Sequence, residues 1–265
     1  MSIVLDGTNG ITAANVYGRN LIINGSGRIN QRVYTSGTAT SGANEYTLDR
    51  WRVVTSGQSL TFTGTDAERV MTAPAGGAEQ VIEGANIAGG TYVLNWTGTA
   101  TATVDGNAVA KGGTFTLTAN TNATVRFTGG TFSEVQVEAG SVATPFEHRS
   151  IGEELALCQR YFCKTFDQGT APAQNAGGNG ALVGYSSVSN ASFGVCWWYP
   201  VTMRAVPTVT TFAPDAASSD WSDQGGARPT ASVTSNGQTN AGLRATGSIL
   251  AGGFYTIQLT ASAEL

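Results

Sequence analysis

Tryptophans set among polar residues are the side chains of this sequence with the clearest capacity to bind a ligand. An indole face stacks on the C–H face of a sugar ring, while Asp, Asn and Arg side chains hydrogen-bond the sugar hydroxyls. Trp221 lies in the long polar segment 213–229, and Trp198 directly follows Trp197. The residues that we predict to bind a glycan are Trp221, Asp215, Asp220, Asp223, Arg228 and Trp198.

The position of these tryptophans relative to the core is open from the sequence. Consecutive side chains of a strand point to opposite faces, so one of Trp197 and Trp198 faces the core. The other meets a second sheet, a neighbouring subunit or solvent. Trp221 follows Asp220 and has other polar neighbours, which favours exposure to a ligand, whereas the alternative is an indole that anchors its loop. Long loops between the strands of a rigid sandwich usually carry binding residues, so we place the ligand site in segment 213–229.

The residues needed for catalysis or metal binding are sparse. The single histidine, His148, has no nucleophile in a Gly-x-Ser-x-Gly context to activate, and we predict no enzyme and no catalytic residues. The paired carboxylates of a glycosidase are recognised by their separation in space, so a glycosidase stays a minor alternative at this stage. Asp220 and Asp223 offer fewer ligands than a known Ca²⁺-binding loop, and we predict no metal ligands.

The composition favours short strands and excludes several functional classes. Of the 265 residues, 35 are glycine and only 12% are charged, a mixture that disfavours long helices and suits strands joined by tight turns. The net charge is −4 and lysine occurs only at Lys111 and Lys164, so we predict no nucleic-acid partner. No run approaches the ~20 apolar residues of a membrane span, and we predict no membrane insertion.

The cysteines and the first residues bear on where the protein is made. Cys158, Cys163 and Cys196 form an odd set without CxxC spacing, which predicts buried, reduced thiols rather than disulfides or a zinc site. The N-terminus lacks the basic region and the apolar stretch of a signal peptide. We therefore expect a protein that is assembled in a cytoplasm and leaves it by lysis or on a particle.

Residues 20–147 show the period-two alternation of short antiparallel strands. Tyr92, Leu94 and Trp96 share one face of such a strand, and the dipeptide Asp105-Gly106 predicts a tight hairpin turn. Short strands at roughly 10-residue spacing indicate an antiparallel sandwich, for which a jelly roll is our first choice. Before this domain, residues 1–19 are predicted to be an extended attachment segment.

The strand pattern is interrupted once. Ser150 and Glu153 form a capping-box pattern followed by apolar residues at helical spacing, which predicts a helical joint in segment 148–164. Strands resume within 165–265, after a polar stretch at 165–180 that we predict to be an exposed loop. The sequence thus predicts an all-β protein of two jelly-roll-like β-sandwich domains joined by one short helix. The strands expected in the second domain are 182–188, 193–203, 208–212, 231–235, 243–249 and 254–261.

Several stretches, taken in order over residues 20–265, resemble phage tail-fibre and receptor-binding proteins. Three stretches look like the opening of the carbohydrate-binding-module-like jelly roll in those proteins. The next two are similar to its closing strand and to the segment after it, and the last two resemble the C-terminal domain. The stretches are Asn20-Leu-Ile-Ile-Asn-Gly25, Arg28-Ile-Asn-Gln-Arg32, Tyr46-Thr-Leu-Asp-Arg-Trp51, Val135-Gln-Val-Glu-Ala-Gly-Ser-Val-Ala-Thr-Pro-Phe146, Glu153-Glu-Leu-Ala-Leu-Cys-Gln-Arg-Tyr161, Tyr199-Pro-Val-Thr-Met-Arg-Ala-Val-Pro-Thr208 and Thr260-Ala-Ser-Ala-Glu-Leu265.

The resemblance implies a homotrimeric virion protein, a tail fibre or a head fibre, that attaches the particle to host-surface polysaccharide or lipopolysaccharide. It also implies assembly in a bacterial cytoplasm, contacts of segment 1–19 with other virion proteins, and a C-terminal domain, 165–265, that trimerises and binds the receptor. Jelly-roll carbohydrate modules often carry a structural Ca²⁺, so such an ion stays open by analogy, with no ligands assigned. One alternative is a structural connector or decoration protein without a receptor site. Another is a secreted lectin, which the missing export signal and disulfides disfavour.

Overall fold

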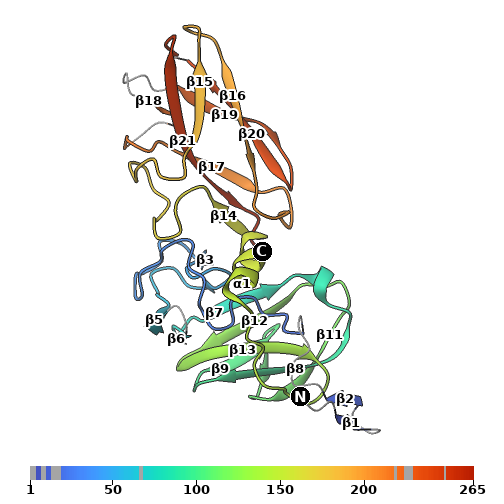
Figure 1. Ribbon diagram of the computed structural model, residues 1–265. Helices are drawn as coiled ribbons and strands as arrows, with labels where there is room; N and C mark the ends of the chain where they lie inside the picture. The colour runs from blue at the N-terminus through green and yellow to red at the C-terminus, as the bar shows by residue number, and fades with distance from the viewer. Residues whose placement is uncertain are drawn as a thin grey trace. The chain divides into compact units, whose positions relative to one another are not determined.

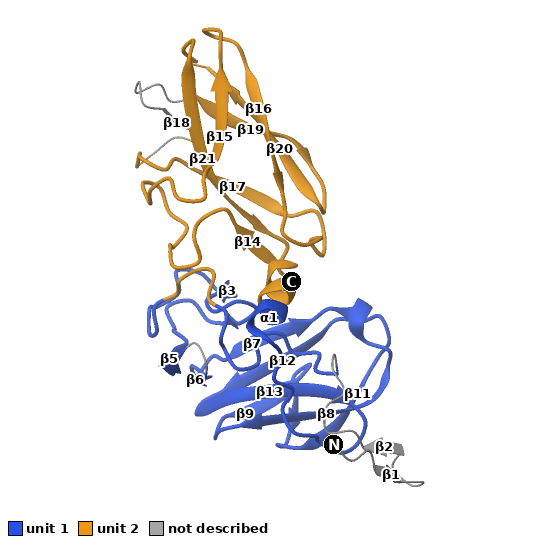
Figure 2. Ribbon diagram, in the orientation of Figure 1, with its two compact units in different colours: residues 1–29, 35–154 blue, residues 30–34, 155–265 orange. Residues whose placement is uncertain are grey.

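The computed structural model describes residues 4–6, 10–12, 19–65, 68–217, 220–223, 229–247 and 249–265 (Figure 1). This part of the chain is mostly β-strand and contains one α-helix, α1 (Ile151–Gln159), and a short 3-10 helix at Gly84–Asn86. The predicted all-β class is therefore confirmed, whereas the jelly-roll connectivity of two domains stays a prediction. The chain divides into two compact units: unit 1 holds residues 1–29 and 35–154, and unit 2 holds residues 30–34 and 155–265 (Figure 2).

Unit 1 is built mainly from two antiparallel sheets, with strand orders β10-β9-β12-β7-β4-β3 and β11-β8-β13-β6-β5. Phe127 of the first sheet stacks on Phe132 of the second with ring centroids 4.6 Å apart, so side chains of both sheets meet in one core. Within the segment predicted to be extended, β1 (Val4–Asp6) pairs antiparallel with β2 (Gly10–Thr12). The sheet strands are β3 (Glu45–Tyr46), β4 (Arg52–Val53), β5 (Thr61–Thr65), β6 (Glu68–Thr72), β7 (Ala78–Ile82), β8 (Gly90–Thr97), β9 (Thr101–Val104), β10 (Asn107–Val109), β11 (Gly113–Leu117), β12 (Ala123–Thr128) and β13 (Thr131–Ala139).

Local patterns in the sequence predicted the details of unit 1 well. Tyr92, Leu94 and Trp96 are all buried, as their alternation along β8 predicted. The predicted hairpin turn joins β9 to β10, with φ of 49° at Asp105 and 82° at Gly106. Positive φ at both central residues is what a two-residue type I′ turn requires, and Asp-Gly adopts it readily.

Helix α1 begins with the predicted capping box. The Ser150 hydroxyl oxygen accepts the N–H of Glu153 at 3.3 Å, while the Glu153 carboxylate accepts the hydroxyl of Ser150 at 2.8 Å and its N–H at 2.9 Å. These bonds hold the pKa of the Glu153 carboxyl below its usual value, and the bond from the Ser150 hydroxyl contributes most. The helix is shorter than the predicted joint, because residues Phe162–Lys164 are already extended as strand β14.

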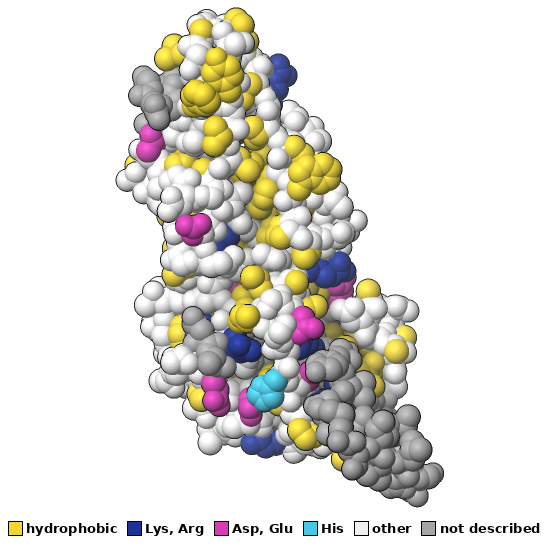
Figure 3. All heavy atoms as spheres, in the orientation of Figure 1, with side chains coloured by type: hydrophobic (Ala, Val, Ile, Leu, Met, Phe, Trp, Pro, Cys, Tyr) yellow, Lys and Arg dark blue, Asp and Glu magenta, His cyan; other side chains and the backbone are white. Residues whose placement is uncertain are grey.

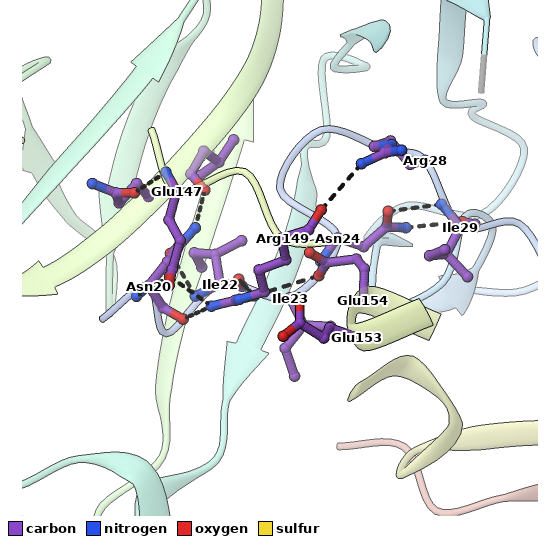
Figure 4. A network of polar contacts seen from close by, with 12 residues as sticks. Asn20, Ile22, Ile23, Asn24, Arg28, Ile29, Glu147, Arg149, Glu153 and Glu154 are labelled. Atoms are coloured by element: carbon purple, nitrogen blue, oxygen red, sulfur yellow. Dashed lines mark hydrogen bonds and ion pairs between the residues drawn. The ribbon is translucent and has the colours of Figure 1, made fainter. Parts of the chain in front are cut away.

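A network of polar contacts ties the residues at the start of α1 to residues 20–24 of unit 1 (Figure 4). The guanidinium of Arg149 pairs with Glu147 at 3.3 Å and with Glu154 at 3.5 Å. It also donates to the carbonyl oxygens of Ile22, at 3.1 Å, and of Asn20. All three charged side chains are less than 10% exposed, so the network is part of the interior of unit 1.

In unit 2, the long strand β21 (Gly253–Ser262) pairs antiparallel with four strands, β14, β15, β17 and β18, and a separate sheet has the order β16-β20-β19. Side chains of both sheets, among them Trp197, Leu243 and Tyr255, form one buried cluster. Each of the six strands expected here overlaps an observed strand, whereas the short β14 and β18 were not predicted. The strands are β14 (Phe162–Lys164), β15 (Leu182–Ser186), β16 (Phe193–Trp198), β17 (Thr208–Phe212), β18 (Ser222–Asp223), β19 (Thr230–Asn236), β20 (Asn240–Thr246) and β21.

Residues 30–34 belong to unit 2, although strands β3 to β13 of unit 1 follow them in the chain. The Gln31 side chain donates to the carbonyl oxygen of Phe162 at 2.8 Å. The Arg32 guanidinium lies 3.8 Å from the centre of the Phe162 ring and pairs with Glu264 at 3.1 Å. From the sequence this segment was expected to belong to the domain 20–147, because local patterns do not report contacts between residues so far apart in the chain.

The cysteines follow the prediction in part. Cys158 and Cys163 are completely buried, and burial raises the pKa of the Cys163 thiol to about 12. Cys196 is exposed, so the prediction of a buried thiol is wrong at this position. The reason is the alternation along β16, which turns Trp197 into the core and its neighbour Cys196 outward. None of the three cysteines, all of which the structure describes, forms a disulfide bond.

Candidate functional site

Trp198 is an exposed aromatic residue on a rigid strand. It is the last residue of β16, which pairs with β20 along its whole length. Trp197 is 7% exposed and packs edge-on against Tyr199, with ring centroids 4.9 Å apart, whereas Trp198 is 69% exposed. The prediction that the two tryptophans face opposite sides is confirmed, and Trp198 is the one that faces solvent.

An open cavity of about 440 Å³ lies beside Trp198 in unit 2. Its apolar lining includes Leu182 and Pro200 in addition to Trp198. The polar side chains of its lining include those of Gln159, Asp167 and Gln168, of which the last two are exposed. The arrangement therefore places an indole beside a carboxylate and two amides that a ligand can reach. These residues and the space between them are called the Trp198 cavity below.

Lys164 and Thr165 hold one wall of the Trp198 cavity in place. The buried Lys164 ammonium donates to the carbonyl oxygens of Gln168 at 3.0 Å and Thr170 at 2.7 Å. The Thr165 hydroxyl donates to the side-chain oxygen of Gln258 in β21 at 2.8 Å. Because these bonds fix the wall to the central strand of unit 2, the cavity is preformed.

Gly180 lies at the end of the loop 165–180 and allows the two ends of this loop to lie against each other. It has a φ of +79°, and a Cβ at this position would lie 2.1 Å from the carbonyl oxygen of Thr165. Only glycine tolerates both the dihedral angle and the close approach. The polar stretch 165–180, predicted to be an exposed loop, thus returns to its own start and forms a wall of the cavity.

The chemistry of the Trp198 cavity suits a hydroxyl-rich ligand. The indole offers a stacking face, the Asp167 carboxylate accepts hydrogen bonds, and the two glutamine amides both donate and accept them. The positive charge of Lys164 is bound by two backbone carbonyl oxygens. The described lining therefore lacks the cluster of outward-facing cations that phosphate recognition uses.

Trp221 does not occupy the surface position that a ligand role requires. It is completely buried and belongs to the core of unit 2, with its ring edge-on to Phe193 at a centroid distance of 5.0 Å. The interpretation of an exposed ligand residue is therefore wrong, and the alternative of a loop anchor describes its position. The polar residues around it had suggested exposure, but the adjacent strand β18 pairs with β21, which carries the indole into the core.

The other residues of the predicted ligand loop do not join Trp198. Asp220 ties the loop to the two strands that flank it: its carboxylate accepts the N–H of Ala231 in β19 at 2.8 Å and the hydroxyl of Thr211 in β17. Asp215 is exposed, and its N–H donates to the hydroxyl oxygen of Ser222 at 3.4 Å. Neither aspartate lines the Trp198 cavity. The side chain of Asp223 and the whole of Arg228 lie outside the described residues.

The described part of the chain contains no group of three or more His, Cys, Asp or Glu side chains that could hold a metal ion. The structural Ca²⁺ stays a prediction by analogy. His148 is exposed, with its ring edge-on to Phe146 at 5.0 Å and its Nε2 4.0 Å from a Glu134 carboxylate oxygen. No helix in the described ranges is long and apolar enough to cross a membrane.

Most residues of the Trp198 cavity were not predicted from the sequence. Trp198 was among the predicted residues, but the ligand site was expected in segment 213–229, whereas the polar groups at the cavity come from residues 159–168. The available signal was the exposed loop predicted at 165–180, which begins inside this range. Its partner Trp198 is distant in the chain, and only the pairing of strands brings the two together.

Comparisons with known proteins assign no family to this chain. No family model, no curated protein and no solved structure matches it. The resemblance to phage fibre proteins therefore stays an expectation from the sequence, and the geometry of the Trp198 cavity is the basis for a functional proposal.

Proposed function

We propose that this protein is a non-enzymatic fibre or spike subunit of a virion, and that it attaches the particle to a host cell by binding surface polysaccharide or lipopolysaccharide in the Trp198 cavity. The observation that carries the proposal is the large indole of Trp198, which is 69% exposed at the end of a fully paired strand and lies beside a preformed polar cavity. Large exposed aromatic residues next to a concave polar surface are typical of ligand sites.

A glycan accounts for the composition of the Trp198 cavity better than other ligand classes do. A peptide groove would require more apolar lining, and a phosphate site would require outward-facing arginines or lysines. The cavity instead combines one stacking surface with the exposed hydrogen-bonding groups of Asp167 and Gln168. The groups of a sugar, an apolar ring face bordered by hydroxyls, complement this combination.

We also propose that the protein is a homotrimer, which an apolar face of unit 2 supports. Val183, Tyr185 and Phe254 are each more than half exposed, and the rings of Tyr185 and Phe254 lie 5.0 Å apart on the paired strands β15 and β21. Hydrophobic side chains gather over these two strands (Figure 3). Neither strand contains a charged residue. Sheets that stay unassociated commonly protect exposed strands with charges, so this face fits burial against other copies of the chain.

Replacing Trp198 by alanine is expected to weaken binding to host cells or to their purified surface glycan by about 1–3 kcal/mol, because the stacking surface is lost. The melting temperature should stay nearly unchanged, since the side chain is mostly exposed. Binding is measured by titration calorimetry on glycan selected from an array. A Val206→Ala variant, which truncates another exposed side chain of unit 2, serves as the matched control. Equal binding of both variants would remove the Trp198 cavity from the proposal.

The double variant Tyr185→Asp/Phe254→Asp is expected to convert the trimer to monomers, because it places two charges where an apolar face is to be buried. Light scattering of the parent should give the mass of three chains, and that of the variant the mass of one. Val142→Asp, which charges a highly exposed valine of unit 1, should stay trimeric. A parent protein with the mass of a single chain would contradict the trimer directly.

The alternative functions predict different outcomes for the same experiments. A connector or decoration protein would form the trimer but bind neither host cells nor glycan. A secreted lectin would bind glycan without being part of a particle, which antibody labelling of purified virions detects.

A further inference from the structure

We infer a second carbohydrate-binding site, in unit 1, which takes a neutral saccharide on the outer face of the sheet β10-β9-β12-β7-β4-β3. It is a cavity of about 310 Å³ that shares no residue with the Trp198 cavity of unit 2. The two sites can therefore be tested independently of each other. The lining residues that carry the inference are Arg52, Glu79, Thr103, Asp105 and Arg126.

The site lies on a row of polar side chains that crosses the sheet. Residues directly opposite each other on paired strands point to the same face, so a row in register forms one surface. The neighbours of this row along the strands, such as Val53, Ala78 and Phe127, are buried in the core, which places the row on the outer face. The residues in register, from one strand to the next, are Tyr46, Arg52, Glu79, Arg126 and Thr103.

Glu79 orients two arginines at the centre of this row. One carboxylate oxygen accepts Nε and Nη2 of Arg52 at 2.9 and 2.6 Å, and the other accepts Nε of Arg126 at 2.6 Å and lies 2.6 Å from its Nη2. The carboxylate is only 2% exposed although it lies on the outer face of a sheet. Since it is enclosed by charged partners, both guanidinium groups are held in fixed orientations.

The backbone at Gly77 leaves room for the side chain of Arg126. Gly77 has a φ of +100°, and a Cβ at this position would lie 2.8 Å from Cδ of Arg126. The absence of a side chain at Gly77 therefore leaves the space in which the stem of Arg126 lies. On the other side of the cavity, the carboxylate of Asp105 accepts the N–H of Thr124 at 2.7 Å, which fixes the turn between β9 and β10.

The cavity is lined by both hydrogen-bond donors and hydrogen-bond acceptors, which favours a ligand rich in hydroxyl groups. A guanidinium has five N–H donors, and Arg126 contacts Glu79 through Nε and Nη2 while its side chain is 41% exposed. Asp105 and Thr103 supply acceptors. The two arginines and the two carboxylates of the lining cancel in formal charge. A site of this kind matches hydroxyl groups, which both donate and accept, better than a polyanion.

Binding to the full-length chain in a Trp198→Ala background tests the inference. The ligands are a panel of short neutral oligosaccharides of glucose, galactose, mannose or rhamnose, with uronic acid oligosaccharides alongside, measured by saturation-transfer NMR and calorimetry. We expect at least one neutral oligosaccharide to bind with little dependence on salt concentration. Adding Thr103→Val or Arg126→Met should weaken that binding on the order of tenfold, because each removes hydrogen bonds to the ligand.

Matched controls separate binding from folding. Thr101→Val makes the same change on the same face of β9 outside the cavity, and it should leave binding unchanged. Thr103→Val keeps the fold even if Arg126→Met does not, because valine is well suited to a strand. Binding of acidic ligands alone, with strong salt dependence, would overturn the inference. The inference would also be overturned if no neutral oligosaccharide bound the Trp198→Ala chain, and that result would not contradict glycan binding in the Trp198 cavity. If the Trp198→Ala chain binds every ligand as the parent does, the Trp198 cavity is not a glycan site, whereas the binding that remains supports the site in unit 1.

Discussion

Replacing Trp221 by alanine is expected to lower the free energy of unfolding of unit 2 by about 3–5 kcal/mol, the cost of emptying a core site of tryptophan size. The indole is completely buried and packs edge-on against Phe193, whose ring lies 5.0 Å from Tyr255. Its removal leaves a cavity in the core of unit 2. A loss of this size is a large part of the stability of an ordinary domain.

Denaturant unfolding followed by tryptophan fluorescence measures the effect, with Trp198→Ala as the matched control. The control removes the same side chain from an exposed position of the same unit, and we expect it to change stability by no more than about 0.5 kcal/mol. The two variants should also differ in function, since only Trp198 lines the proposed glycan cavity. A Trp221→Ala protein with parental stability would show that the indole is not part of the core.

Replacing Arg149 by methionine is expected to destabilise unit 1 by about 3–5 kcal/mol, because it leaves two buried carboxylates without their cation. The guanidinium pairs with Glu147 and Glu154 and donates to backbone carbonyl oxygens of residues 20 and 22 (Figure 4). Methionine fills a similar volume, so the loss would come from electrostatics and hydrogen bonds rather than from a cavity.

Thermal and denaturant unfolding test this prediction, with Lys111→Met as the control. Lys111 is an exposed cation of the same unit, so its replacement removes the same charge from the surface and should cost less than about 0.5 kcal/mol. An Arg149→Met chain that unfolds at the same denaturant concentration as the Lys111→Met chain would contradict a structural role for the network.

The proposed trimer and the two proposed sites together would allow the particle to bind a cell through several sites at once. Each trimer would present three copies of the Trp198 cavity and three of the site in unit 1. When several weak sites on one particle bind the same polysaccharide, the overall affinity exceeds that of a single site by a factor of roughly 10²–10⁴. Modest affinity at each site is therefore compatible with firm attachment.

Short-range patterns in the sequence were sufficient to predict the elements and several local details. The alternation of apolar residues predicted the buried face of β8 and the opposite directions of Trp197 and Trp198. Ser150 and Glu153 predicted the start of the only α-helix among the described residues, and Asp105-Gly106 predicted a hairpin turn. These features depend on residues within one turn or one strand of each other, so the sequence alone determines them.

The tertiary structure decided which side chains became available for binding. Trp221 is buried because the adjacent Ser222 lies in register with Thr256, 34 residues further along the chain. Its polar neighbours carry no information on that pairing. Glu79 meets Arg52 and Arg126 across 27 and 47 residues, so this group of three charged side chains forms only once the strands β4, β7 and β12 have paired. A binding site is formed by residues that are far apart in the chain and come together in the folded protein, whereas sequence periodicity reports only on near neighbours.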